Sequence, residues 1–173
     1  QQAFDPGEFD AYVASAVADW EVPGLAVAVV KDGELLFERG YGVLALGEER
    51  PVDEHTLFAI GSTTKAMTAA ALAMLSDAGK LSLDDRVTDH LPWFQLKDPY
   101  VTRELRVRDL LTNNAGLGNA DFLWYEQDRN TEDIIRALRW VDPAYSFRSG
   151  FVYQNIMYAT AGEVIAAVSG MSW

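Results

Sequence analysis

An uninterrupted apolar run, Ala66–Leu75, is the feature that most constrains the fold. It follows Lys65 directly, contains no Gly or Pro, and consists mainly of the strong helix formers alanine, methionine and leucine. The run therefore predicts a helix of about three turns, which Gly79 ends. Because apolar residues occupy nearly the whole circumference, we expect this helix to be buried inside a core.

Ser62 stands three residues before Lys65, so both side chains are expected on one face of the helix start. A serine hydroxyl becomes a good nucleophile when a neighbouring base removes its proton, and lysine can be that base when burial and nearby charge lower its pKa. The helix N-terminus also directs unpaired N–H groups at a developing oxyanion. The pair predicts a nucleophile and its base, although a helix N-cap is an alternative role for Ser62.

Composition restricts the partners of the chain. Its 173 residues are 49% hydrophobic and 12% aromatic, as expected for one globular domain with a sizeable core. The net charge of −12 repels phosphate backbones, so no nucleic acid partner is expected. No apolar run is long enough for a membrane span. Gln1-Gln2-Ala3 carries no basic signal-peptide start, so we expect a periplasmic or secreted protein whose signal peptide is already removed, with a cytoplasmic location left open.

Cysteine is absent, which excludes thiol nucleophiles, disulfides and cysteine metal sites. His55 and His90 are the only histidines, and neither belongs to a metal-ligand pattern such as H-E-x-x-H. The sequence also lacks a G-x-S-x-G elbow, which argues against a Ser-His-Asp hydrolase. We therefore predict no metal and no other cofactor.

The N-terminal third predicts a helix followed by a β-hairpin. Apolar residues recur at helical spacing over Phe4–Trp20, after which Leu25–Val30 and Leu35–Tyr41 read as two strands joined by an Asp-Gly turn. A two-stranded hairpin is marginal by itself, and only residues 56–60 offer a further, short strand. We expect the hairpin to belong to an incomplete antiparallel sheet.

This pattern divides the chain into a helix and hairpin at 1–60, a nucleophile helix at 61–80 and a helical region at 81–173. The C-terminal sheet strands and a C-terminal helix are expected to be missing from the chain. Within the helical region we predict a loop connection at 81–99, a short helix at Arg106–Thr112, turns at 113–118, a helix at Glu132–Val141 capped by Thr131, and a helix at Ile156–Ser169 closed by Gly170.

Tyr153 and Asn155 stand two residues apart, where a loop enters the last helix. A phenol beside a lysine ammonium has a lowered pKa, so Tyr153 can pass a proton between Ser62 and a leaving group. Asn155 can hold a substrate amide or the lysine. Taken alone, the two residues are better explained as a packed tyrosine and a capping asparagine. Trp124 and Tyr125 either line a pocket or fill the core between helices.

Two motifs together indicate a family. Ser62-Thr63-Thr64-Lys65 resembles the S-x-x-K motif of serine β-lactamases and penicillin-binding proteins. Tyr153-Gln154-Asn155 resembles the Y-x-N element of class C β-lactamases, D-alanyl-D-alanine carboxypeptidases and family VIII esterases. The resemblance implies an α+β, β-lactamase/transpeptidase-like fold, of which this chain is the N-terminal half. Further similar segments, in the expected order, are Pro23–Val29, Leu81–Asp85, Leu110–Leu117 and Tyr158–Trp173.

The resemblance also implies roles for individual residues. Ser62 would be the acyl-accepting nucleophile and one backbone oxyanion donor, with Lys65 as its base or proton partner. Tyr153 would relay the proton, and Asn155 would hydrogen-bond the substrate. In relatives the position of Asn113 often carries His. The other substrate-binding candidates are Asn113, Trp124 and Tyr125.

A third motif of the relatives, Lys or His followed by Thr or Ser and then Gly, is absent here. His55-Thr56-Leu57 is the nearest string, but it lacks the Gly and precedes Ser62. We expect a serine hydrolase that cleaves a β-lactam, a D-amino-acid peptide or an ester through an acyl-enzyme on Ser62. The alternative is a non-catalytic penicillin-binding-like module, or an inactive fragment that needs a C-terminal partner chain or self-association to complete the sheet.

Overall fold

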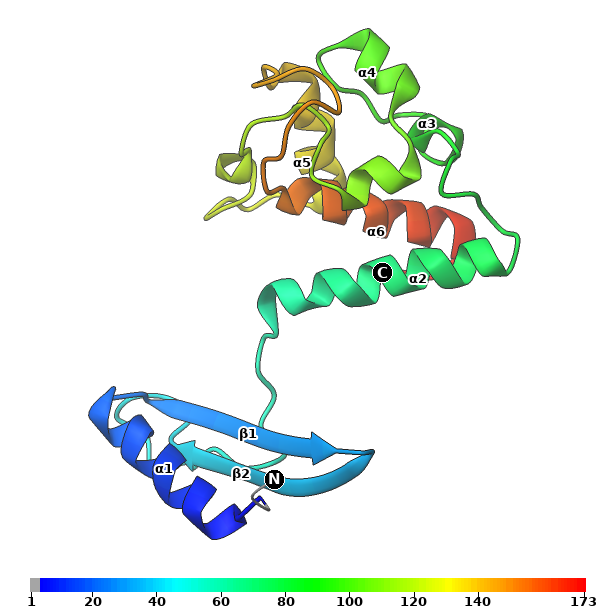
Figure 1. Ribbon diagram of the computed structural model, residues 1–173. Helices are drawn as coiled ribbons and strands as arrows, with labels where there is room; N and C mark the ends of the chain where they lie inside the picture. Colours follow the sequence, from blue (N-terminus) through cyan, green and yellow to red (C-terminus); the bar gives the residue numbers. More distant parts are fainter. Residues whose placement is uncertain (1–3) are drawn as a thin grey trace. The chain divides into compact units, whose positions relative to one another are not determined.

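The computed structural model describes residues 4–173, which form two compact units divided between Ala59 and Ile60 (Figure 1). The prediction made from Gln1-Gln2-Ala3 lies outside the described residues. Helix α1 and both strands belong to the first unit. All of the remaining helices belong to the second unit, which contains the predicted site residues.

Helix α1 (Pro6–Asp19) packs on the hairpin of the first unit (Figure 1). Asp5 caps its N-terminus by accepting hydrogen bonds from two backbone N–H groups of the first turn. Asp10, one helical turn further on, binds strand β2. Its carboxylate accepts hydrogen bonds from Arg39 at 2.5 Å and from Tyr41 at 2.6 Å. The predicted N-terminal helix is confirmed.

The hairpin consists of β1 (Gly24–Lys31) and β2 (Glu34–Gly42), paired antiparallel. Asp32 and Gly33 both have positive φ, as a two-residue type I′ turn requires, and this confirms the predicted Asp-Gly turn. Residues 56–60, the weakest of the predicted strands, form no strand. Within residues 4–173 the sheet therefore has two strands.

Helices α2 and α6 pack against each other in the second unit (Figure 1). Side chains from many of its elements form one core with them, including Leu72, Leu110 and Ile156, which are fully or almost fully buried. The elements of this unit are η1 (Gly61–Thr63), α2 (Thr64–Asp77), α3 (Val87–His90), α4 (Pro99–Glu104), η2 (Val107–Leu111), η3 (Asp121–Leu123), α5 (Thr131–Ala137), η4 (Leu138–Trp140) and α6 (Asn155–Ser169).

Helix α2 is less buried than its composition predicts. Thr68 and Leu72 are its buried residues, and they lie on one face. Met67 and Met74 are 62% and 71% exposed. The prediction of a helix buried on every side is wrong for the described residues. Apolar residues around the whole helix do not determine how many of its faces are covered by other segments.

Helix boundaries differ from the predictions where capping decides them. Asn130, not Thr131, caps α5, because its side chain accepts the N–H of Asp133 at 2.8 Å. The predicted helix at 132–141 is thus α5 followed by the 3-10 helix η4. The loop predicted at 81–99 contains the four-residue helix α3 and ends at α4, which begins with the Asp98 cap and Pro99.

Candidate active site

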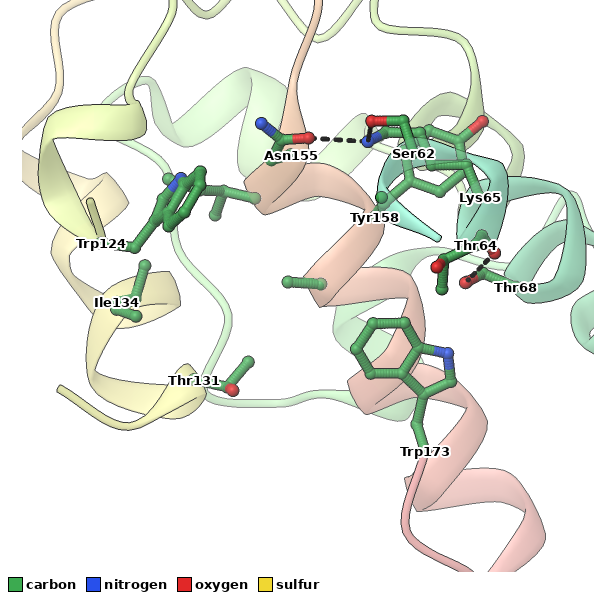
Figure 2. A pocket seen from close by; sticks show the side chains of 13 residues that line it. Ser62, Thr64, Lys65, Thr68, Trp124, Thr131, Ile134, Asn155, Tyr158 and Trp173 are labelled. Atoms are coloured by element: carbon green, nitrogen blue, oxygen red, sulfur yellow. Dashed lines mark hydrogen bonds between the residues drawn. The ribbon is translucent and has the colours of Figure 1, made fainter. Parts of the chain in front are cut away.

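Ser62 and Lys65 meet at the start of helix α2. Ser62 lies in η1 and Lys65 in the first turn of α2, and Lys65 Nζ donates to Ser62 Oγ at 3.4 Å (Figure 2). The serine is exposed and the lysine is half-buried. The N-cap position of α2 is Thr63, so Ser62 is not the cap of this helix. Its hydroxyl is directed to other side chains.

The closest partner of the serine is Tyr153. Ser62 Oγ and Tyr153 Oη are hydrogen-bonded at 2.5 Å, closer than the lysine. Lys65 Nζ lies 4.4 Å from the centre of the tyrosine ring. The Lys65 ammonium, and next the hydrogen bond with Ser62, lower the pKa of the Tyr153 phenol below its ordinary value of 10.0, because both favour the phenolate. Tyr153 is therefore the better placed of the two groups to accept the serine proton.

Asn155 holds the lysine from the other side. Its Oδ1 accepts a hydrogen bond from Lys65 Nζ at 2.6 Å (Figure 2). Asn155 begins α6, and Gln154 before it is extended, so consecutive side chains point to opposite sides. Gln154 is 1% exposed in the core, which leaves Tyr153 and Asn155 on the side of Ser62. The backbone alternation explains the spacing of this tyrosine and this amide.

A cavity of about 470 Å³ opens beside these residues (Figure 2). Its size falls within the range of small-molecule sites. Ser62, Lys65, Asn155 and three threonines contribute polar groups, and aromatic and aliphatic side chains form much of the rest. The remaining lining residues are Gly61, Thr64, Thr68, Trp124, Thr131, Ile134, Ile156, Tyr158, Ala159 and Trp173.

The family model described as Beta-lactamase matches residues 9–173. The chain belongs to this family. An unguisins hydrolase, ungD, from Aspergillus violaceofuscus is 32% identical over 95% of the chain, and penicillin-binding protein 4 from Amycolatopsis lactamdurans is 32% identical over 98%. The chain spans 30% and 45% of the lengths of these two relatives.

The solved structures agree with this family assignment. The octameric penicillin-binding protein homologue from Pyrococcus abyssi superposes with a TM-score of 0.82 and 27% identity, over 98% of this chain and 40% of that one. The predicted α+β, β-lactamase/transpeptidase-like fold is confirmed. The hairpin and the helical unit are the parts of that fold that residues 4–173 contain.

Asn113 lies behind the site of this β-lactamase-family chain. It is 8% exposed and has a left-handed φ of 55°. Its Oδ1 accepts the backbone N–H of Gln154 at 2.9 Å, and its backbone oxygen accepts from the N–H of Val152 and from the hydroxyl of Tyr145. Asn113 thus anchors the segment that carries Tyr153, and its side chain is already engaged there.

The predicted aromatic pair divides between two positions. Trp124 lines the cavity, while Tyr125 is 62% exposed, is not among the lining residues and packs edge-on against the Trp124 ring. Two neighbours of the site were missed in the sequence. Tyr158 follows Asn155 by three residues on the same helix face, a spacing that could have revealed it. Asp121, which accepts hydrogen bonds from Asn155, has no comparable sequence signal.

Neither histidine is among the hydrogen-bonding partners of Ser62. The His90 ring is paired with Asp85 at 3.0 Å, and His55 is exposed in the first unit. Among residues 4–173, His, Asp and Glu side chains form no group of three able to hold a metal ion. No helix in this range is both long and apolar enough to cross a membrane.

The depressed pKa of Tyr153 leads to a first prediction. Because the Lys65 cation stabilises the phenolate, this phenol should ionise below its ordinary value, and Lys65→Met should shift its ionisation to higher pH. The measurement is a spectrophotometric phenolate titration, with Tyr153→Phe subtracted in each background. Tyr158 is a useful internal contrast, because burial raises its pKa. An unchanged Tyr153 titration in Lys65→Met would contradict this electrostatic coupling.

Proposed function

We propose that the protein is a serine acyl hydrolase that reacts through an acyl-enzyme on Ser62. The observation that carries the proposal is the contact of one serine hydroxyl with both Tyr153 and Lys65 beside a cavity. A serine hydroxyl is activated by such a neighbouring base when further groups orient that base. Here Lys65 lies beside Tyr153, and Asn155 in turn holds Lys65.

In the first step, Ser62 Oγ attacks the substrate carbonyl carbon and its proton moves to Tyr153 Oη. The new C–O bond forms a tetrahedral oxyanion, and the backbone N–H of Ser62, at a helix start, is available to stabilise it. When the bond to the leaving nitrogen or oxygen breaks, Tyr153 returns the proton to that atom. Water then attacks the acyl carbon and gives one proton to Tyr153 Oη. The acyl C–Oγ bond breaks, that proton passes to Ser62 Oγ, and the acid product keeps the water's other proton. The Lys65 ammonium stabilises the phenolate form of Tyr153, which is the form that accepts each proton.

The names of two relatives indicate which classes of substrate to test first. One relative is named as a hydrolase of unguisins and another for binding penicillin. We infer a small-molecule or peptide acyl substrate and retain β-lactams, D-amino-acid peptides and esters as candidates. The cavity beside Ser62 has the size for the part of such a substrate that lies next to the scissile bond.

We also infer that the antiparallel sheet is completed by strands outside residues 4–173, from the same protein or a partner. A two-stranded sheet is marginal, and this chain spans only 30% and 45% of the lengths of the two relatives. Those strands would provide the third motif and the second oxyanion donor. We retain as a proposal the division into a helix and hairpin at 1–60, a nucleophile helix at 61–80 and a helical region at 81–173; the last two belong to one compact unit.

The proposed function is tested by covalent labelling. The whole protein is treated with a fluorophosphonate or a fluorescent penicillin, and the modified peptide is identified by mass spectrometry. We expect the added mass on Ser62 and none in Ser62→Ala. An adduct that forms and then hydrolyses indicates turnover, whereas a permanent penicillin adduct favours the binding module. No adduct on Ser62 with either reagent would refute the proposal.

A further inference from the structure

Asp121 lies directly behind Asn155. Both of its carboxylate oxygens accept hydrogen bonds from Asn155 Nδ2 at 3.2 Å. Trp124 Nε1 donates to Oδ1 at 2.9 Å, Asn119 Nδ2 donates to Oδ2 at 3.2 Å, and the backbone N–H of Asp121 donates to Asn119 Oδ1. Asp121 takes part in none of the ion pairs found among residues 4–173. Its carboxylate is thus held by neutral N–H donors.

These contacts determine the orientation of the Asn155 amide. On one side is the Lys65 ammonium, which only donates hydrogen bonds; on the other is the Asp121 carboxylate, which when ionised only accepts them. The oxygen of the amide must face the lysine and its nitrogen must face the aspartate. The reverse orientation would place two donors together and two acceptors together, so both hydrogen bonds would be lost.

We propose that Asp121 is a positioning residue that locks the Asn155 amide with its oxygen toward Lys65 and thereby keeps the lysine beside Ser62. This inference rests on the proposed function of Ser62. Lys65 has a flexible side chain, and its shortest hydrogen bond is the 2.6 Å contact with Asn155. If the amide rotates, an NH₂ group replaces that acceptor. The Lys65 ammonium then loses its shortest hydrogen bond and is no longer held beside Ser62.

The same carboxylate also holds part of the cavity wall. Trp124 lines the cavity and donates its indole N–H to Asp121, so one side chain fixes both a wall residue and the lysine's acceptor. Asp121 lies in η3, and Asn155 begins α6, so the contact joins two segments distant in sequence. Asp121 therefore links η3 and the adjoining Trp124 to the residues around the nucleophile.

The test is the rate at which a fluorophosphonate labels Ser62 in the whole protein. Asp121→Asn keeps the shape of the side chain but removes its charge. It also replaces one of the two oxygens that accept hydrogen bonds from Asn155 with an NH₂ group, which can only donate. We expect labelling to slow by about ten- to a hundredfold, the range found when a hydrogen-bonding partner that orients a metal ligand is removed. Asp128→Asn, an exposed position on the same loop with the same change in charge, should leave the rate unchanged.

A double-mutant cycle separates positioning from a general effect on the fold. Asn155→Ala removes the group through which Asp121 is proposed to act. In that background, the further change Asp121→Asn should alter the labelling rate by less than about twofold. An equal rate loss in both backgrounds would overturn the inference. Circular dichroism monitors folding, and Asp121→Ser replaces Asp121→Asn in the cycle if the asparagine variant does not fold.

The Tyr153 titration gives a second readout. Its nearby charged or titratable groups are Lys65, Asp121 and Tyr158. Loss of the Asp121 charge alone would lower the pKa of Tyr153, whereas displacement of Lys65 would raise it. We expect a rise in Asp121→Asn, and a fall would overturn the inference. If the wild-type protein is not labelled at all, the proposed function fails. If the wild type is labelled and Asp121→Asn is labelled at the same rate, the proposed function stands and the positioning role of Asp121 fails.

Discussion

Replacing Lys65 with methionine should reduce the rate of Ser62 acylation by about a thousandfold or more, since the change removes the cation that makes Tyr153 acidic. Methionine is a strong helix former of similar length, so α2 should form normally. The measurements are the fluorophosphonate labelling rate and the hydrolysis of a p-nitrophenyl ester by the whole protein. Both should fall together, because the same hydroxyl is the nucleophile in each reaction.

Lys80→Met is the matched control for this prediction. Lys80 follows the end of α2 and is exposed, so its replacement removes one positive charge without touching the site. We expect both rates to stay within about twofold of the wild type. If Lys65→Met retained wild-type labelling while remaining folded, the lysine would not take part in activating Ser62, and the reaction would depend on Tyr153 by itself.

The sequence was informative where neighbouring residues share an element. Ser62 and Lys65 lie within one helical turn, so their contact follows from the three-residue spacing. The helix at 156–169 and its left-handed Gly170 cap follow from apolar periodicity and from the tolerance of glycine for positive φ. Here local rules suffice, because the interacting groups are fixed by the geometry of a single segment.

The sequence was less informative where segments distant in the chain meet. The sequence of residues 113–125 does not show that Asp121 accepts a hydrogen bond from Asn155. Nor does it show that the Asn113 side chain binds the backbone N–H of Gln154. The predicted burial of α2 is too high for the same reason. The hydrophobicity of a helix face favours its burial but does not show whether another segment packs against it. Contacts between loops depend on the tertiary fold, which short-range rules do not specify.

An ion pair between the buried Asp109 and the partly exposed Arg148 leads to the last prediction. Asp109, in η2, is 4% exposed and accepts two hydrogen bonds from the Arg148 guanidinium, at 3.0 and 2.6 Å. It also accepts the backbone N–H of Arg106. Arg148 has a left-handed φ of 60°, and the hydrogen bond with Asp109 raises its pKa. The pair therefore fastens the segment leading to Tyr153 onto the core.

Asp109→Asn should lower the free energy of unfolding by about 2 kcal/mol, because it leaves the Arg148 cation without its counter-ion. A larger loss is not expected, since the Arg148 side chain is 45% exposed and water can partly solvate it. The measurement is urea unfolding followed by tryptophan fluorescence, as most of the tryptophans lie in the second unit.

Asp142→Asn provides the matched control, because it removes the same charge from an exposed pair with Lys97. That pair should contribute no more than about 0.5 kcal/mol. Asp109→Asn should in addition slow the labelling of Ser62, since the segment before Tyr153 loses its attachment, whereas Asp142→Asn should not. Equal stability losses in the two variants would mean that burial of Asp109 does not distinguish it from a surface carboxylate. The segment before Tyr153 would then have to be held mainly by Asn113 and its hydrogen bonds to Val152, Gln154 and Tyr145.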